Sequence, residues 1–244
     1  MATAQLYLYK QLRERFQRPY DYYADVYFNK VAVVFSNLEE EADKIARSHY
    51  EDLGQYFNPE IHDESDFVDS AFEKGLEYYE AVSLVRYNSK LMWFSTMYQF
   101  WEQQVRKFLY DEIKKSGITL CNEKGKEIEF KDFCTNGIRD IKSWFKHFDY
   151  DIEKIENWSD INELRLLANV IKHGDGGAAT TLEKLRPDFF KSEISDYNLM
   201  KSHRTVLNEQ VLNINDSELI KYKEALQSFW GELPERLYCK IAEI

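Results

Sequence analysis

Three polar side chains fall on one line of an otherwise apolar segment, residues 162–177 (NELRLLANVIKHGDGG). Arg165, Asn169 and His173 are four residues apart, so a helix would stack them along one face. A guanidinium, an amide and an imidazole that titrates near neutral pH suit an anionic ligand such as a phosphate. The structural alternative is that His173 interacts with the carbonyl end of the helix, while Arg165 is a solvated surface residue.

This combination favours cleavage of RNA without a metal. The imidazole of His173 would take the proton from a 2′-hydroxyl group, which would then attack its own phosphate. Arg165 or Lys172 would neutralise the charge that gathers on the phosphoryl oxygens, and Lys172 and Asp175 are the candidate substrate-binding residues. DNA lacks the 2′-hydroxyl group, so the chemistry would be specific for RNA.

Other catalytic and ligand-binding classes lack their motifs. The sequence contains no GxSxG, no HExxH and no GxxxxGK[ST] pattern, and Cys121, Cys134 and Cys239 form no CxxC pair. We therefore expect no metal site and no cofactor.

Arg165, Asn169 and His173, called the polar stripe below, share one face only if they lie on a helix, and this helix should end close to His173. Leu164, Leu167, Ala168 and Ile171 have the spacing of a buried helical face, and Gly174 suits the left-handed residue that ends a helix. Ser159 or Asp160, with Glu163 after it, predicts a capping box at the start of this helix. A short helix stopped before Pro187 would follow.

The whole chain is predicted to be all-α, a multi-helix bundle with long antiparallel helices and at most one short β-hairpin. Its 244 residues include only 9 Gly and 4 Pro, which favours long helices over many turns. We predict helices over 4–18 (ended by Pro19), 21–53, 66–115, 130–149 and 215–233, a terminal helical tail, a strand pair within 204–214, and a turn or hairpin around Lys124-Gly125-Lys126. The segment 66–115 is either one helix or two stacked helices with a break near 87–89.

Two units are predicted, an N-terminal helical extension over 1–65 that packs on the core, and a helical core with a C-terminal elaboration over 66–244. Whether residues 1–65 are integral or a regulatory arm stays open. The second half of 66–115 carries so wide an apolar surface that it favours cover by the rest of the domain and by another chain.

The net charge of −11 argues against a generic nucleic-acid binder but leaves room for a small basic site. The first residues, MATAQLYLYKQLRERF, lack the apolar core of a signal peptide, and no apolar run is long enough to span a bilayer. We expect a cytoplasmic protein with no membrane partner. The acidic stretch 39–44 is interpreted as a solvated face.

A long two-helix core, followed by a helix that ends in asparagine, three residues, histidine and glycine, resembles the HEPN superfamily. These all-helical domains occur in prokaryotic toxin–antitoxin, CRISPR-associated and phage-defence proteins. The resemblance covers residues 66–180, and it carries the family histidine over to His173 and a polar residue to Asn169. It implies a homodimer in which two motifs form one ribonuclease site. Ala168 stands where the family has arginine, and Arg165 lies eight residues before the histidine.

Three functions remain open. The first is a HEPN-like metal-independent ribonuclease of phage defence or a toxin–antitoxin system, with RNA as substrate and a cognate antitoxin or defence-system partner. The second is a catalytically inactive HEPN-like module that binds RNA, nucleotide or a protein partner, which Ala168 and the acidic surface favour. The third is a structural helical protein whose aromatic face serves assembly.

Overall fold

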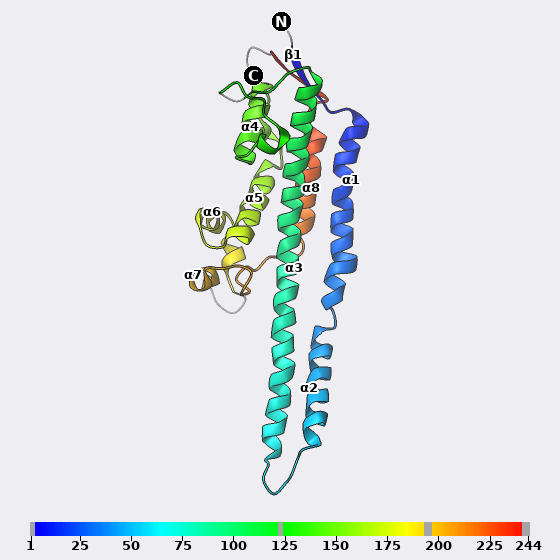
Figure 1. The fold of residues 1–244 in the computed structure, drawn as a ribbon, viewed down its shortest axis with the longest axis vertical. Coiled ribbons are helices and arrows are strands. Elements are labelled where there is room, and N and C mark those ends of the chain that lie inside the picture. Colours follow the sequence, from blue (N-terminus) through cyan, green and yellow to red (C-terminus); the bar gives the residue numbers. More distant parts are fainter. Residues whose placement is uncertain (1–2, 122–123, 193–196, 241–244) are drawn as a thin grey trace.

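The computed structural model describes residues 3–121, 124–192 and 197–240, and it confirms an all-α fold with one small two-stranded sheet (Figure 1). The longest helix, α3, runs the length of the molecule, and α2 packs along its N-terminal part. The other long helices gather around its C-terminal part. The helices are α1 (Lys10–Val26), α2 (Leu38–Gly54), α3 (Glu64–Lys115), α4 (Ile138–His147), α5 (Trp158–His173), α6 (Gly177–Leu185), α7 (Leu199–His203) and α8 (Glu218–Glu232).

Helix α3 is continuous over 52 residues, about 78 Å at 1.5 Å per residue. The carboxylate of Asp63 accepts a hydrogen bond from the amide of Ser65 and caps the first turn. Lys114 and Lys115 complement the carbonyl end of the helix dipole. The alternative of two helices with a break at 87–89 is wrong, because Tyr87 packs in the core within an unbroken helix.

The core is built from aromatic side chains where α3, α5 and α8 meet. Trp101 of α3 is fully buried, and its ring lies 5.0 Å from that of Phe229 on α8 and 6.4 Å from that of Trp158 on α5. Both pairs meet edge to face, the arrangement that ring quadrupoles favour. This contact holds α5, and with it the predicted polar stripe, against the long helix.

The sheet joins the two ends of the described chain. Strand β1 (Thr3–Tyr7) pairs antiparallel with β2 (Arg236–Lys240), with Gln5 opposite Tyr238. The predictions of a helix over 4–18 and of a helical tail after Pro234 were therefore wrong at these positions. The physical reason is pairing with β2, which buries Ala4 and Leu6 on one side of the strand and leaves Gln5 on the other.

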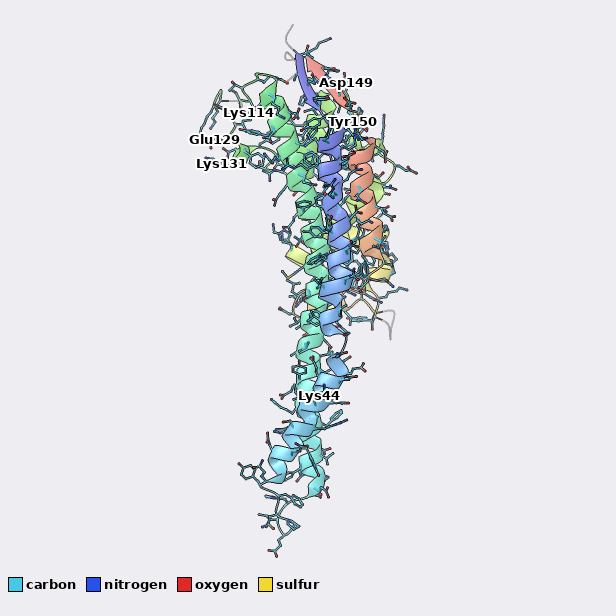
Figure 2. All side chains as sticks on the ribbon, turned by 90° about the vertical axis from the view of Figure 1, so that its right-hand side faces the viewer. Lys44, Lys114, Glu129, Lys131, Asp149 and Tyr150 are labelled. Atoms are coloured by element: carbon cyan, nitrogen blue, oxygen red, sulfur yellow. The ribbon has the colours of Figure 1, made fainter. Side chains whose placement is uncertain are left out.

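Helix α1 continues through Pro19 instead of ending there, although a proline inside a helix costs about 3 kcal/mol. Packing of the buried Tyr20 and Ala24 outweighs that cost. Arg13 fastens α1 to α8 by donating to the carbonyls of Trp230, Gly231 (2.6 Å) and Leu233 (2.7 Å) at the end of α8. The two helices lie side by side in Figure 2.

Two other predicted helices are shorter than expected. The segment 21–53 is broken after α1 by a π-helical turn, Tyr27–Val31, and a 3-10 turn, Ala32–Phe35, before α2 begins. The segment 130–149 contains a 3-10 turn, Phe130–Asp132, and only then α4, because Cys134 and Gly137 have positive φ angles that a helix does not accept. Around Lys124-Gly125-Lys126, Cys121 and Glu127 form an isolated bridge, while residues 122–123 lie outside the described residues.

The predicted strand pair within 204–214 was wrong, since none of these residues is in a strand. The hydroxyl oxygen of Tyr87 accepts hydrogen bonds from the amides of Val211 (3.2 Å) and Leu212 (3.1 Å), and the carbonyl of Phe189 accepts one from Asn213 (2.7 Å). These partners satisfy backbone donors that a strand ladder would otherwise have to satisfy.

Residues 3–65 contact two different parts of the rest of the chain. Strand β1 and helix α1 pack with the C-terminal β2 and α8, whereas α2 packs on α3. None of the described helices combines the length and apolar character needed to cross a membrane.

Candidate functional site

Helix α5 forms as the apolar spacing predicted. Its face of Leu164, Leu167, Ala168 and Ile171 is buried, and Leu166 and Val170 widen it. The predicted capping box is absent, because Glu163 forms hydrogen bonds with Arg186 and Tyr222 and no side chain in the described part of the chain caps the first turn. Tertiary packing holds this end of the helix in place of a local cap.

Arg165 is half-buried and turned toward its own helix and α3. Its Nε and Nη2 atoms donate to Oδ1 of Asn162, at 3.1 and 2.9 Å. Burial and the neighbouring Glu102 carboxylate raise the pKa of Tyr98 far above its usual value, and the positive charge of Arg165 opposes this increase. Along the helix axis Arg165 lies about 12 Å from His173. The structure therefore does not bring this guanidinium to the histidine within one chain.

Lys172, His173 and Asp175 lie together at the carboxyl end of α5, and all three side chains are exposed. Asn169 is half-buried one turn earlier. Among the residues that the structure describes, none forms a hydrogen bond with the imidazole of His173. This imidazole is therefore open to a ligand from solvent.

The start of α6 lies four residues beyond this histidine. Gly176 stands at its N-cap position, no side chain of the described residues caps its first amides, and its first turn contains no acidic residue. Uncapped amides at the positive end of a helix dipole attract anions. The exposed side chains of Lys172 and His173 therefore lie within five residues of the first amides of α6 along the chain.

Gly174 makes the sharp turn between the two helices. Its φ of +71° belongs to the region that favours glycine, and its amide donates to the carbonyl of Val170 at 2.8 Å. A Cβ atom at this position would lie 2.8 Å from the carbonyl oxygen of Arg204, which itself accepts from the amide of Asp175 at 3.2 Å. The loop after α7 therefore packs directly on the end of α5.

We expect Gly174→Ala to lower the free energy of unfolding by about 2 kcal/mol, because alanine adds backbone strain and a clash with Arg204. Urea titration followed by circular dichroism measures the change. Gly176→Ala is the matched control, since its φ is extended and no atom of another described residue lies close to its added Cβ. Equal stability of the two variants would show that the turn tolerates a side chain.

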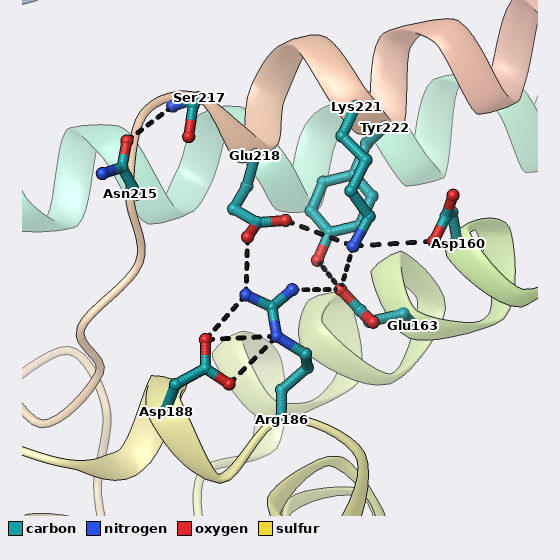
Figure 3. Close-up of polar contacts among 9 residues, drawn as sticks. All are labelled: Asp160, Glu163, Arg186, Asp188, Asn215, Ser217, Glu218, Lys221 and Tyr222. Atoms are coloured by element: carbon teal, nitrogen blue, oxygen red, sulfur yellow. Dashed lines mark hydrogen bonds and ion pairs between the residues drawn. The ribbon is translucent and has the colours of Figure 1, made fainter.

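A second polar group, which the sequence did not indicate, surrounds Arg186 (Figure 3). The guanidinium lies 2.7 Å from Glu163 of α5, 2.5 Å from Glu218 of α8 and 2.7 Å from Asp188. It also covers the ring of Phe189, 3.8 Å from its centroid. Burial opposes ionisation of Glu218, but Arg186 and Lys221 outweigh it, so the pKa of Glu218 lies below its usual value.

Lys221 completes the cluster from α8. Its ammonium lies 2.7 Å from Glu163, 3.2 Å from Glu218 and 3.5 Å from Asp160, and the hydroxyl of Tyr222 donates to Glu163 at 2.6 Å. Every carboxylate of the group thus faces a cation. The cluster joins the amino-terminal half of α5 to α8 and to the segment after α6, which is a structural role.

No metal-binding arrangement accompanies the site: across 3–121, 124–192 and 197–240, no three His, Cys, Asp or Glu side chains are placed to hold an ion.

Comparison of the chain with models of known protein families, with curated proteins and with solved structures found no match.

Proposed function

We propose that the chain is a HEPN-like, metal-independent ribonuclease of phage defence or a toxin–antitoxin system. The observation that carries the proposal is the exposed imidazole of His173, which has no hydrogen-bond partner among the described residues and lies four residues before the start of α6. In this proposal the protein is a cytoplasmic homodimer with a cognate antitoxin or defence-system partner.

The chemistry assigns each group a separate task. His173 accepts the proton of the ribose 2′-hydroxyl group, whose oxygen attacks the adjacent phosphorus. The bond from phosphorus to the 5′-oxygen of the next nucleotide breaks, and this oxygen takes a proton from water as it leaves. Lys172 and the first amides of α6 stabilise the phosphoryl oxygens, while Asn169 orients the phosphate or the imidazole. Arg165 acts from the second copy in a composite site, because within its own chain it lies two turns away.

We expect purified wild type to cleave single-stranded RNA in the presence of EDTA and to leave 2′,3′-cyclic phosphate ends. His173→Ala should reduce the rate by about 100-fold or more, the size of a lost general base. Its thermal stability should not change, because the side chain is exposed and forms no hydrogen bond within the described chain.

The matched control is His203→Ala, which removes another exposed histidine from the last position of a helix, α7. It should cleave like wild type. Equal cleavage by wild type and His173→Ala, or no cleavage by folded wild type, would overturn the nuclease proposal.

A second function, a silent HEPN-like module that binds RNA, nucleotide or a protein partner, has its own support. Ala168 is buried, so the position of the family arginine points into the core, and the guanidinium of Arg165 is held by Asn162. Wild type that retards an RNA oligonucleotide in a gel without cutting it, with weaker binding by Lys172→Ala, would support this module.

A further inference from the structure

The acidic charge of the protein is concentrated in one projecting part, the arm, defined as residues 38–80. It consists of α2, the connection after it and the N-terminal part of α3, and it extends as a two-helix hairpin beyond the other helices (Figures 1 and 2). The arm contains 14 Asp or Glu and 3 Lys or Arg, a net charge of −11. The rest of the chain contains 29 of each and is neutral.

The two helices of the arm approach closely and leave a shallow groove of about 180 Å³. Its floor is made of small residues, since a Cβ atom on Gly75 would lie 3.0 Å from both the carbonyl oxygen of Ala42 and the Cβ of Ala46. Phe72 and Leu76 form one wall. The groove is therefore apolar at its base.

Apolar side chains beside this groove face solvent. Val68, Phe72 and Leu76 are four residues apart on α3, and their exposed fractions are 49%, 67% and 41%. Phe57 and Ile61, both in the connection between the two helices, add to the apolar surface of the arm. A continuous exposed apolar row with a charged border marks an interaction surface.

Carboxylates border this row on both sides. Asp69, Glu73 and Glu77 run parallel to it on α3, one residue further along, while Glu39 and Asp43 of α2 line the groove. Carboxylates four residues apart on a helix repel one another by about 0.2–0.5 kcal/mol per pair. One of them, Glu77, is paired with Lys74 at 2.9 Å, and that pair is exposed. A cationic partner would relieve the repulsion.

We propose that the arm is the docking site for a basic amphipathic helix of a partner protein. The apolar face of that helix covers Phe72, Leu76 and the groove, and its lysines or arginines meet the bordering carboxylates. A second copy of this chain is a poor occupant, because it would bring another arm of charge −11. RNA is a poor occupant for the same reason, since its phosphates are negative.

The probe is a fluorescent synthetic helix of about five turns with leucines on one face and lysines on the other, and binding to the full chain is measured by anisotropy. We expect Phe72→Ser/Leu76→Ser to weaken binding about tenfold or more, because it removes the apolar anchors. Neutralising the parallel row (Asp69→Asn/Glu73→Gln/Glu77→Gln) should weaken it at about 50 mM salt and have less effect at about 300 mM.

Matched variants outside the arm distinguish binding at the arm from nonspecific binding of the peptide to exposed apolar or acidic side chains. Val85→Ser/Met92→Ser removes two side chains that are comparably exposed on the same helix, and Asp25→Asn/Asp132→Asn/Glu224→Gln removes three exposed carboxylates. Both should bind the probe within about twofold of wild type. A lysine peptide with serines in place of leucines should bind about tenfold more weakly than the probe.

Four results would overturn the proposal. They are equal binding of the leucine–lysine and serine–lysine peptides, equal binding by the arm variants and wild type, self-association that Phe72→Ser/Leu76→Ser abolishes, and retardation of an RNA oligonucleotide that the same substitution abolishes.

Discussion

Replacing Arg186 with methionine is expected to lower the free energy of unfolding by about 3 kcal/mol at neutral pH. The substitution keeps most of the apolar stem but leaves the largely buried carboxylates of Glu163 and Glu218 with only Lys221 as a countercharge. Removing one member of a buried ionic group costs more than the pair itself contributes, because the remaining charge stays desolvated. Urea titration at pH 7 measures the difference.

The pH profile of this variant distinguishes electrostatics from lost packing. The pKa values of Glu218 and Asp188 are lowered in the folded protein, so their contribution to stability is complete above their unfolded pKa values and disappears as pH falls through the folded ones. The difference between wild type and Arg186→Met should therefore shrink as pH falls below about 4. A difference that stays constant with pH would assign the effect to packing.

The control for this prediction is Arg139→Met, which changes an exposed arginine of α4. Its effect should stay within about 0.5 kcal/mol at every pH, as expected for a surface substitution. A loss as large as that of Arg186→Met would mean that the cluster in Figure 3 is not the source of the stability.

Trp101→Ala is expected to lower the free energy of unfolding by about 4 kcal/mol, the usual range for a buried tryptophan. The side chain is fully buried and lies against Phe229 and Trp158, so its removal leaves a cavity where α3, α5 and α8 meet. Chemical unfolding followed by far-UV circular dichroism, which reports the helix content, measures the change.

Trp101→Phe tests the packing argument in the same position. The indole Nε1 is buried and forms no hydrogen bond with the described part of the chain, so replacing the indole with a phenyl ring strands no partner. We expect a loss of about 1.5 kcal/mol or less. Equal losses for phenylalanine and alanine would show that ring volume is not what stabilises this junction.

The candidate site was only partly predictable. The helical spacing indicated α5 and its end at Gly174, because a repeating apolar face and a glycine stop are local features. The bond between Arg165 and Asn162 is also local, at a spacing of three residues, yet the sequence did not show which of its possible partners the guanidinium would choose. Neutral and charged partners compete, and the packed surroundings settle the choice.

The sequence by itself determined the all-α class and the helix that carries His173, because apolar periodicity and the scarcity of Gly and Pro act within a few turns. The sequence left open whether residues 66–115 form one helix or two, and the structure has one. Only the tertiary structure decided what depends on distant partners. Residues 4–7 form a strand because β2 pairs with them. Helix α1 continues beyond Pro19 because Tyr20 and Ala24, which follow the proline, are buried in the core. Glu163 joined Arg186 and Lys221 instead of capping its own helix. Long-range burial and charge pairing outweigh local preferences of about 1–3 kcal/mol at each of these places.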